Sequence, residues 1–191
     1  MVTTRTTRAD VVAAAGRMFA DKGYHGTSMR DIGRAVGLLG SSLYAHIDSK
    51  EDLLVEVVDE GARLFLESAR RAREAGGDSR SRLRSLIVGH IDVVLDHLDV
   101  VRTYLNEARM LDPTHRARVV AARDSYESIF RDVLGQGVAE GAFRDDLDPK
   151  VASIMVLSVL NTVERWYHPD GYLGRDELVA EIWRFVGDGL S

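Results

Sequence analysis

The sequence predicts an all-helical protein with no β-sheet. Apolar residues recur at helical spacing along nearly the whole chain of 191 residues, and no segment alternates polar and apolar side chains as a strand would. The chain has only 3 Pro, a residue that interrupts helices. Hydrophobic residues make up 45% and charged residues 29%, an ordinary globular composition in a chain long enough to bury a core without disulfides. We expect nine helices.

The first predicted helix runs from about Thr7 to Lys22. Thr7 and Asp10 have the spacing of a capping box, in which each side chain accepts a hydrogen bond from the other residue's backbone N–H. Gly23 suits the left-handed position after a helix, and Tyr24 can make the accompanying apolar contact. The apolar face of this helix comprises Val11, Ala15, Met18 and Phe19.

Two short helices are expected next, joined by a tight turn at Gly37, where glycine bends without steric cost. Thr27 or Ser28 can cap the first of them. The second runs from about Leu39 to His46. The inward face of the first comprises Met29, Ile32, Ala35 and Val36.

A second capping box opens a long fourth helix at Ser49-Lys50-Glu51-Asp52. Gly76-Gly77 is the one flexible break that follows it. The apolar stripe of this helix comprises Leu53, Leu54, Val57, Leu64 and Phe65.

The rest of the chain predicts five more helices. Asp112-Pro113 and Asp148-Pro149 each place a capping residue before a proline at the first helical position, and Gly141 ends the helix that begins at Pro113. The five helices lie near 80–98, 101–111, 113–140, 150–167 and 175–187.

Charge divides the chain into a head, residues 1–50, and a body, residues 51–191. The head carries a net charge of +3 and the body −8. One interpretation is that the charged residues are distributed by chance. The functional interpretation is a head that binds nucleic acid, attached to an acidic body. The chain shows neither a signal peptide nor a run of apolar residues long enough to span a membrane, so we expect it in the cytoplasm.

Several function classes are not expected. The chain has no Cys, which excludes disulfides, thiolate metal sites and cysteine nucleophiles. It has no Gly-x-Ser-x-Gly motif, no phosphate-binding glycine loop and no distinct pair of carboxylates, so we expect no enzyme and no cofactor. His90 and His97 lie about 10 Å apart along one helix, too far to share a metal ion.

The segment from Asp31 to Lys50 has the pattern of a helix-turn-helix unit, in which the second helix enters the major groove of DNA. Any three packed helices can produce a similar turn, which is the structural alternative. The residues predicted to reach base edges are Arg30, Gly40, Ser41 and Ser42. The residues predicted to contact phosphates are Thr27, Tyr44, His46 and Lys50.

The same region resembles the N-terminal domain of the TetR family of transcriptional regulators over residues 7–54, without gaps. The matching positions are Phe19-Ala20, Lys22-Gly23-Tyr24, Thr27, Asp31-Ile32, Ala35, Gly37, Leu43-Tyr44, His46 and Ser49-Lys50-Glu51-Asp52-Leu53. The chain departs from the family pattern at Leu39-Gly40, where a polar cap and a basic residue or proline are usual. It departs again at Ala45, where an aromatic or basic residue is common.

This resemblance implies a homodimeric regulator in which a ligand in the C-terminal domain changes the spacing of the two DNA-reading heads. We therefore predict a ligand-responsive repressor that binds a pseudo-palindromic operator. The alternative is a protein of the same fold that binds a ligand or partner and no DNA. The effect on transcription, repression or activation, is not determined by the sequence.

The C-terminal part is similar to family members that regulate lipid, steroid and aromatic-acid catabolism, several of which respond to acyl-CoA thioesters. The motifs that carry this resemblance are Gln136-Gly137-Val138-Ala139-Glu140-Gly141, Phe143-Arg144, Asp146-Leu147-Asp148-Pro149 and Arg165-Trp166-Tyr167. The predicted effector is a small apolar acid or its CoA thioester.

Mostly apolar residues with a few polar groups are expected to line the effector cavity. Arg165 would bind the carboxylate or a CoA phosphate. Alternatively, Arg165 caps a helix end and His90 is a core residue. The predicted lining comprises Phe65, His90, Tyr104, Tyr126, Phe130, Asn161 and Arg165.

The eighth predicted helix is apolar on more than one side, which predicts burial on more than one side, and together with the ninth helix it forms the predicted dimer interface. The alternative is that both only fill the core of one subunit. The residues concerned are Val151, Ile154, Met155, Val156, Leu157, Val159, Leu160, Val163, Leu178, Ile182, Trp183, Phe185 and Val186.

Overall fold

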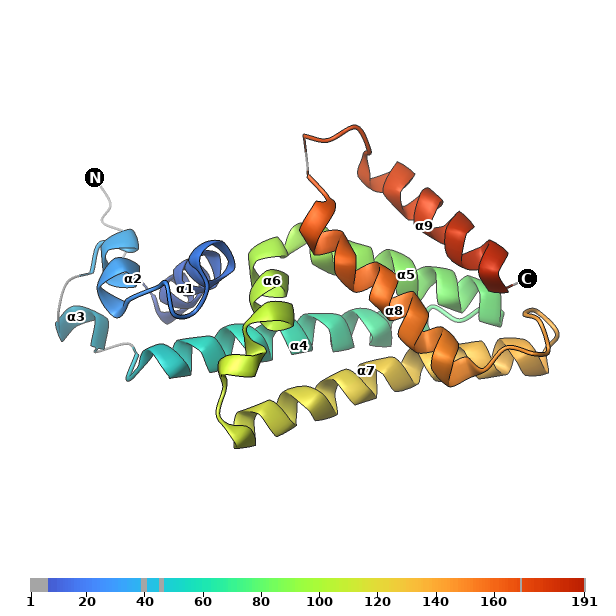
Figure 1. The fold of residues 1–191 in the computed structure, drawn as a ribbon, viewed down its shortest axis with the longest axis horizontal. Coiled ribbons are helices and arrows are strands. Elements are labelled where there is room, and N and C mark those ends of the chain that lie inside the picture. Colours follow the sequence, from blue (N-terminus) through green and yellow to red (C-terminus); the bar gives the residue numbers. More distant parts are fainter. Residues whose placement is uncertain (1–6, 39–40, 45–46, 169, 191) are drawn as a thin grey trace. The chain divides into compact units, whose positions relative to one another are not determined.

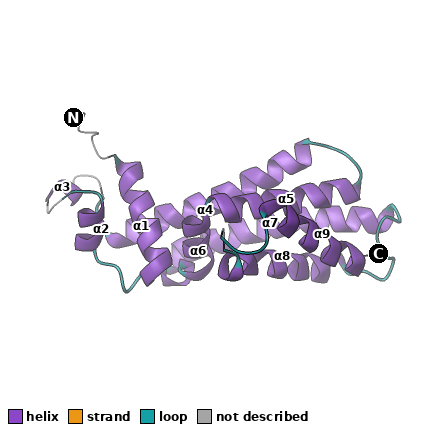
Figure 2. Ribbon diagram, turned by 90° about the horizontal axis from the view of Figure 1, so that it is seen from above, coloured by secondary structure: helices purple, strands orange, loops and turns teal. Residues whose placement is uncertain are grey.

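The computed structural model describes residues 7–38, 41–44, 47–168 and 170–190, and every regular element within these ranges is helical (Figures 1 and 2). The prediction of an all-helical fold is confirmed. The described elements are α1 (Arg8–Lys22), α2 (Met29–Ala35), α3 (Ser41–Tyr44), α4 (Lys50–Glu74), α5 (Ser79–Asp96), α6 (Leu98–Asn106), the 3-10 helix η1 (Ala108–Met110), α7 (Pro113–Ala139), α8 (Pro149–Trp166) and α9 (Arg175–Leu190).

The sixth helix begins and ends earlier than the sequence predicts. The backbone leaves the helical conformation at His97 (φ −132°, ψ 40°), so α5 ends at Asp96 and α6 begins at Leu98. After Asn106 the chain tightens into the 3-10 turn η1 instead of continuing as an α-helix. The predicted ends of the third helix, near 39 and 46, lie outside the described residues.

The described residues group into two compact units. Unit 1 comprises Met1–Arg63 and His97–Val120, and unit 2 comprises Leu64–Asp96 and Ala121–Ser191. Residues 97–120 thus join the N-terminal region, although they follow it by more than thirty residues of intervening chain. The division into a DNA-binding domain, 1–50, and a ligand-binding domain, 51–191, concerns function and stays a prediction.

The capping box at the start of α1 is confirmed. The Asp10 N–H donates to the Thr7 hydroxyl at 3.3 Å, and the Thr7 N–H donates to the Asp10 carboxylate at 2.8 Å. The hydrogen bonds that the Asp10 carboxylate accepts from the backbone N–H and the hydroxyl of Thr7 hold the pKa of Asp10 below its usual value. At the other end Gly23 has the expected positive φ of 72°, but its ψ of 165° lies outside the left-handed helical region because the chain turns at once into an extended loop.

Ser28, and not Thr27, caps α2. The Asp31 N–H donates to the Ser28 hydroxyl at 3.2 Å, and the Ser28 N–H donates to the Asp31 carboxylate at 3.3 Å. Hydrogen bonds from Ser28 lower the pKa of Asp31. A carboxylate at this position also interacts favourably with the positive end of the helix dipole.

The turn after α2 is a Schellman motif, which explains the glycine at position 37. Gly37 has φ 71°, and its N–H donates to the carbonyl of Arg34 at 3.3 Å. The N–H of Leu38 reaches back to the carbonyl of Gly33 at 2.8 Å. This pair of bonds satisfies two carbonyls that the end of the helix would otherwise leave unpaired, and it directs the chain toward α3.

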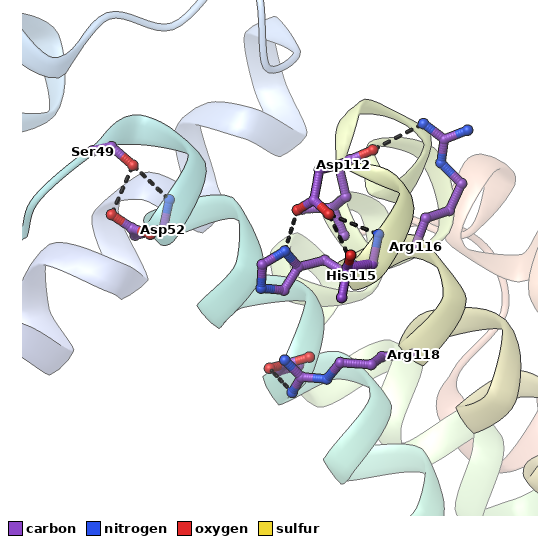
Figure 3. Close-up of polar contacts among 9 residues, drawn as sticks. Ser49, Asp52, Asp112, His115, Arg116 and Arg118 are labelled. Atoms are coloured by element: carbon purple, nitrogen blue, oxygen red, sulfur yellow. Dashed lines mark hydrogen bonds and ion pairs between the residues drawn. The ribbon is translucent and has the colours of Figure 1, made fainter.

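The long helices α4 and α7 begin at caps that the sequence predicts (Figure 3). The Ser49 hydroxyl accepts from the Asp52 N–H at 3.0 Å and donates to the Asp52 carboxylate at 2.7 Å. Asp112 accepts from the backbone N–H groups of Thr114 and His115 and also contacts the His115 ring. Hydrogen bonding to the His115 side chain is the main cause of the lowered pKa of Asp112.

Within unit 1, α1 packs closely against α6. The buried hydroxyl of Thr103 donates to the carbonyl of Gly16 at 3.2 Å. A Cβ added to Gly16 would lie 3.4 Å from a methyl group of Val57 on α4, an ordinary van der Waals contact. The rings of Phe19 and Tyr24, 5.5 Å apart, make the predicted contact beyond the end of α1.

Within unit 2, α5 packs against both α8 and α9. Its buried face includes Leu83, Ile87 and Ile91, all essentially inaccessible to solvent. The guanidinium of Arg175 at the start of α9 binds the carboxylates of Asp92 and Asp96 on α5.

In the part of the chain that the structure describes, none of the helices has the length and hydrophobicity of a membrane span.

We predict that Gly37→Ala destabilises the protein by about 1 kcal/mol, because alanine pays a conformational penalty at positive φ. A Cβ at Gly37 would meet no other atom within 4 Å, so the loss would be conformational and not steric. Gly189→Ala is the control, because its Cβ also meets nothing and its φ is ordinary; alanine in place of this helical glycine should leave stability unchanged or raise it. Urea unfolding of the two variants measures the difference, and equal stabilities would contradict the turn described above.

Candidate functional site

The exposed end of unit 1 is formed by α2 and α3. The side chain of Arg30 at the start of α2 is exposed, and so is that of Ser42 in α3. Tyr44 is 55% exposed, which is unusual for a tyrosine in so small a helical unit. Polar and basic side chains free of core packing are what contact with DNA requires.

Three of the predicted DNA-binding residues cannot be placed fully. Gly40 and His46 lie outside the described residues. Ser41 begins α3, and its side chain is also outside the description. The roles assigned to these residues remain predictions.

Thr27 is a buried link between α1 and the loop before α2. Its side chain is 2% exposed. Its hydroxyl lies 3.1 Å from the carbonyl oxygen of Met18 and 3.0 Å from that of Gly23, and it donates to this pair. These bonds fix the loop that leads into α2, and the fixed loop in turn orients the N-terminus of α2.

Lys50, in the first turn of α4, holds the same loop from the other side. Its ammonium donates to the carbonyls of Tyr24 and Thr27, each at 2.9 Å. It also lies 4.1 Å from the centre of the Tyr24 ring, which adds a cation–π interaction. An ammonium has three N–H donors, so these two bonds leave one for a phosphate.

Glu107 is a contributor to this region that the sequence did not suggest. Its carboxylate, just after α6, accepts the backbone N–H of Tyr24 at 3.1 Å. The loop around Tyr24 is therefore held by α4 at its carbonyl and by the end of α6 at its N–H. The two partners are 83 residues apart in the chain, and nothing in the local pattern around Glu107 indicates the contact.

Four of the predicted effector-binding residues form one buried aromatic cluster in unit 2. Phe65 comes from α4, His90 from α5, and Tyr126 and Phe130 from α7. The ring centres of Phe65 and His90 are 4.7 Å apart, and those of Tyr126 and Phe130 are 5.4 Å apart. Helices distant in sequence thus bring these four side chains together. Their role in binding a ligand stays a prediction.

The two polar members of the cluster bind each other. The Nδ1 atom of His90 and the hydroxyl of Tyr126 are hydrogen-bonded at 3.1 Å. His90 is 1% exposed, and its burial lowers its pKa from 6.5 to about 3. The imidazole is therefore neutral at pH 7. Its Nε2 atom is buried and has no hydrogen-bond partner in the described part of the chain.

The other three predicted effector-binding residues lie elsewhere. Tyr104 belongs to unit 1, where its side chain covers Gly61 so closely that a Cβ there would approach it to 2.7 Å. Asn161 is half-buried on α8. The side chain of Arg165, near the end of α8, is 70% exposed and lies 3.4 Å from the carboxylate of Glu164. A shared cavity that includes these three residues stays a prediction.

An apolar groove of about 670 Å³ lies between α8 and α9 in unit 2. Met155 on α8 is 64% exposed and Phe185 on α9 is 69% exposed. Several residues of the predicted dimer interface line this groove, namely Val151, Met155, Val156, Val159, Phe185 and Val186. Leu160, Val163, Leu178 and Ile182 are instead buried within the unit.

The neutral state of buried His90 predicts a specific pH dependence of stability. The folded chain does not protonate His90 until about pH 3, whereas the unfolded chain takes up the proton near pH 6.5. The free energy of unfolding therefore has its full value, as far as His90 is concerned, above pH 6.5. It decreases as the pH falls, and by pH 5 the loss is about 2 kcal/mol. His90→Phe should remove this part of the loss, measured as urea unfolding at pH 7 and pH 5.

The exposed His168 provides the control for this comparison. His168→Gln should leave the loss of stability between pH 7 and pH 5 close to that of the unmodified chain. The same loss in His90→Phe as in the unmodified chain would contradict a neutral, buried His90.

Comparison with known proteins identifies the two parts of the chain. Residues 11–57 match the family described as bacterial regulatory proteins of the tetR family, and residues 76–190 match the tetracyclin repressor-like C-terminal domain. The HTH-type transcriptional repressor KstR2 of Rhodococcus jostii (strain RHA1) is 31% identical over 189 residues, which cover 96% of this chain and 91% of that protein.

Solved structures agree with this match. The ketosteroid transcriptional regulator KstR2 of Mycobacterium tuberculosis has a TM-score of 0.91 at 27% identity, over 100% of this chain and 97% of that chain. AibR in complex with isovaleryl coenzyme A and operator DNA has a TM-score of 0.85 at 27% identity, over 93% of this chain and 96% of that chain. These relatives are regulators and not enzymes, and KstR2 agrees with the predicted likeness to regulators of steroid catabolism. The chain belongs to the TetR family of bacterial transcriptional regulators.

Proposed function

We propose that this protein is a homodimeric, ligand-responsive repressor that binds a pseudo-palindromic operator. The observation that carries this proposal is the exposed α2–α3 end of unit 1, whose supporting loop is fixed by Thr27, Lys50 and Glu107. Two related regulators are named as repressors, and AibR is a neighbour bound to operator DNA. A two-fold dimer would require half-sites about one helical turn apart or slightly more.

In this proposal α3 enters the major groove. Ser41 and Ser42 approach base edges, Arg30 reads a base from the start of α2, and Tyr44 donates to a phosphate. Gly40 and His46 keep their predicted contacts. Thr27 and Lys50 act chiefly by holding the loop, and the third N–H of Lys50 supplies a phosphate contact.

The experiment is an anisotropy titration of the protein's own upstream DNA against random DNA at several salt concentrations. Lys50→Ala should weaken binding to all sequences and reduce the salt slope by about one phosphate per protomer. Tyr44→Phe should also weaken binding to all sequences. Lys150→Ala, an exposed lysine on α8, is the matched control and should change nothing.

A protein without preference for its own upstream DNA would contradict the proposal. That result would favour the alternative, a protein of the same fold that binds a ligand or partner and no operator. An unchanged salt slope in Lys50→Ala, with weaker binding, would assign Lys50 to loop support alone.

The groove between α8 and α9 supports the dimer. Large apolar side chains are exposed there, and a second copy would bury them. Homodimers are typical of this family, and a stable interface should bury at least about 1,500 Å² in total. A two-fold axis through this face would pair the groove of one protomer with Met155 and Phe185 of the other.

We predict that Phe185→Glu shifts the protein from dimer to monomer in sedimentation velocity at micromolar concentration, because a buried, unpaired carboxylate is unfavourable. Met155→Glu should have the same effect. Val120→Glu is the control, since Val120 is 50% exposed, belongs to unit 1 and is not among the residues that line this groove. A monomeric unmodified protein would refute the proposed interface.

The proposed effector is a small apolar acid or its CoA thioester. AibR, the neighbour noted above, holds isovaleryl coenzyme A, and the aromatic cluster of unit 2 offers an apolar wall for an acyl group. Arg165, with its exposed guanidinium, would bind a carboxylate or a CoA phosphate. α4 contributes residues to both units and is the proposed transmitter of the signal.

A ligand releases DNA only if it binds the non-operator conformation more tightly, and a hundredfold preference corresponds to about 2.7 kcal/mol. A panel of apolar acids and their CoA thioesters should therefore contain a compound that raises Tm and lowers operator affinity together. Arg165→Ala should lose this response and keep operator binding, whereas Arg84→Ala, an exposed arginine on α5, should keep both. A thermal shift with unchanged operator affinity would contradict the mechanism.

A further inference from the structure

The aromatic cluster of unit 2 contains a hydrogen-bonding atom that the fold does not use. Nε2 of His90 is buried and has no hydrogen-bond partner among the described residues. Phe65 lies on one side of the imidazole, with ring centres 4.7 Å apart, and Tyr126 lies 5.9 Å away. A buried polar atom without a partner costs stability, so its presence in an otherwise apolar cluster calls for a physical reason.

The bond on the other side of the ring determines which nitrogen carries the proton. Imidazole nitrogen is a stronger acceptor than a phenolic oxygen, so the Tyr126 hydroxyl donates to Nδ1 of His90 across their 3.1 Å contact. The proton of the neutral ring then resides on Nε2. Because the two ring nitrogens point in different directions, this N–H points away from the Tyr126 hydroxyl.

We propose that the Nε2–H of His90 donates to the thioester carbonyl of an acyl-CoA effector, with Tyr126 as the residue that positions the imidazole. The inference rests on the proposed function and names the chemical group that the buried end of that site recognises. The acyl chain would lie against the rings of Phe65, Tyr126 and Phe130, which are already buried against one another.

The surroundings favour a neutral carbonyl over a free carboxylate. None of the four ring side chains carries a charge at pH 7, and burial keeps His90 neutral. A carboxylate placed there would lose its hydration without gaining a cation, which is far costlier than burying a carbonyl with one hydrogen bond. The guanidinium of Arg165 is 70% exposed, so it is suited to the phosphates of CoA in solvent.

The test compares pairs of ligands that differ in the carbonyl alone. Isovaleryl-CoA and its thioether, 3-methylbutyl-CoA, form the first pair, and the octanoyl and benzoyl thioesters with their thioethers form two more. Calorimetry with the full-length protein should give at least one thioester that binds about tenfold more tightly than its thioether, the size of one good buried hydrogen bond. His90→Phe should bring this ratio close to one and retain binding of the thioether.

A second measurement needs no ligand. Multiple-bond proton–nitrogen spectra of the histidine rings distinguish the two neutral tautomers, and His90→Phe assigns the signals of His90. The expected result is a proton on Nε2 in the unmodified protein, which Tyr126→Phe should shift toward a mixture of tautomers. A proton on Nδ1 in the unmodified protein would overturn the proposal.

The binding outcomes separate this inference from the function on which it rests. Equal affinity for thioester and thioether overturns the role of His90 and leaves the acyl-CoA effector in place. If thioester still binds about tenfold more tightly than thioether in His90→Phe, the role of His90 is likewise overturned and the acyl-CoA effector stays in place. Absence of binding by every compound overturns the effector class and this inference together, whereas operator binding is judged by its own titration.

Discussion

Within unit 1 the hydroxyl of Thr103 on α6 donates to the carbonyl of Gly16 on α1, in a contact from which water is excluded. Such a contact requires the two helices to approach closely, so that a side chain of α6 reaches the main chain of α1. α1 has small residues on its buried face and cannot form a core alone. The helix-turn-helix region therefore depends on residues 97–106, and the two bonded residues lie 87 positions apart in the sequence.

The same dependence extends to the loop between α1 and α2. Its backbone is held by the Thr27 hydroxyl, by the ammonium of Lys50 on α4 and by the carboxylate of Glu107 after α6. Each of these bonds joins a side chain to the main chain, so they fix the position of α2 without determining which bases are read. In the proposed function, base readout belongs to the exposed side chains of α2 and α3. Loop support and base readout would then be carried by different side chains, and a change in one could leave the other intact.

Unit 2 contrasts with this arrangement, because it keeps polar atoms where an apolar core would be more stable. The imidazole of His90 is neutral and half-satisfied, and its one hydrogen bond is to Tyr126. Large apolar side chains are also exposed along the α8–α9 groove. Both features are unfavourable in an isolated, unliganded chain. In the proposed function a ligand would cover the first feature and a second protomer the second, which would make both favourable.

The helical class, the positions of most helices, their caps and the turn at Gly37 could be predicted from the sequence, because these depend on residues within a few positions of each other. Of the seven residues predicted to line one effector cavity, Phe65, His90, Tyr126 and Phe130 lie together in the structure, and their role in binding a ligand stays a prediction. The sequence pattern placed the end of α6 wrongly and did not indicate Glu107. Three further features became visible only in the folded chain. Residues 97–120 join unit 1, the side chains of Thr27 and Lys50 donate to backbone carbonyls, and Arg165 is exposed. These outcomes depend on which distant surfaces pack together, and the local spacing of apolar residues does not determine that packing.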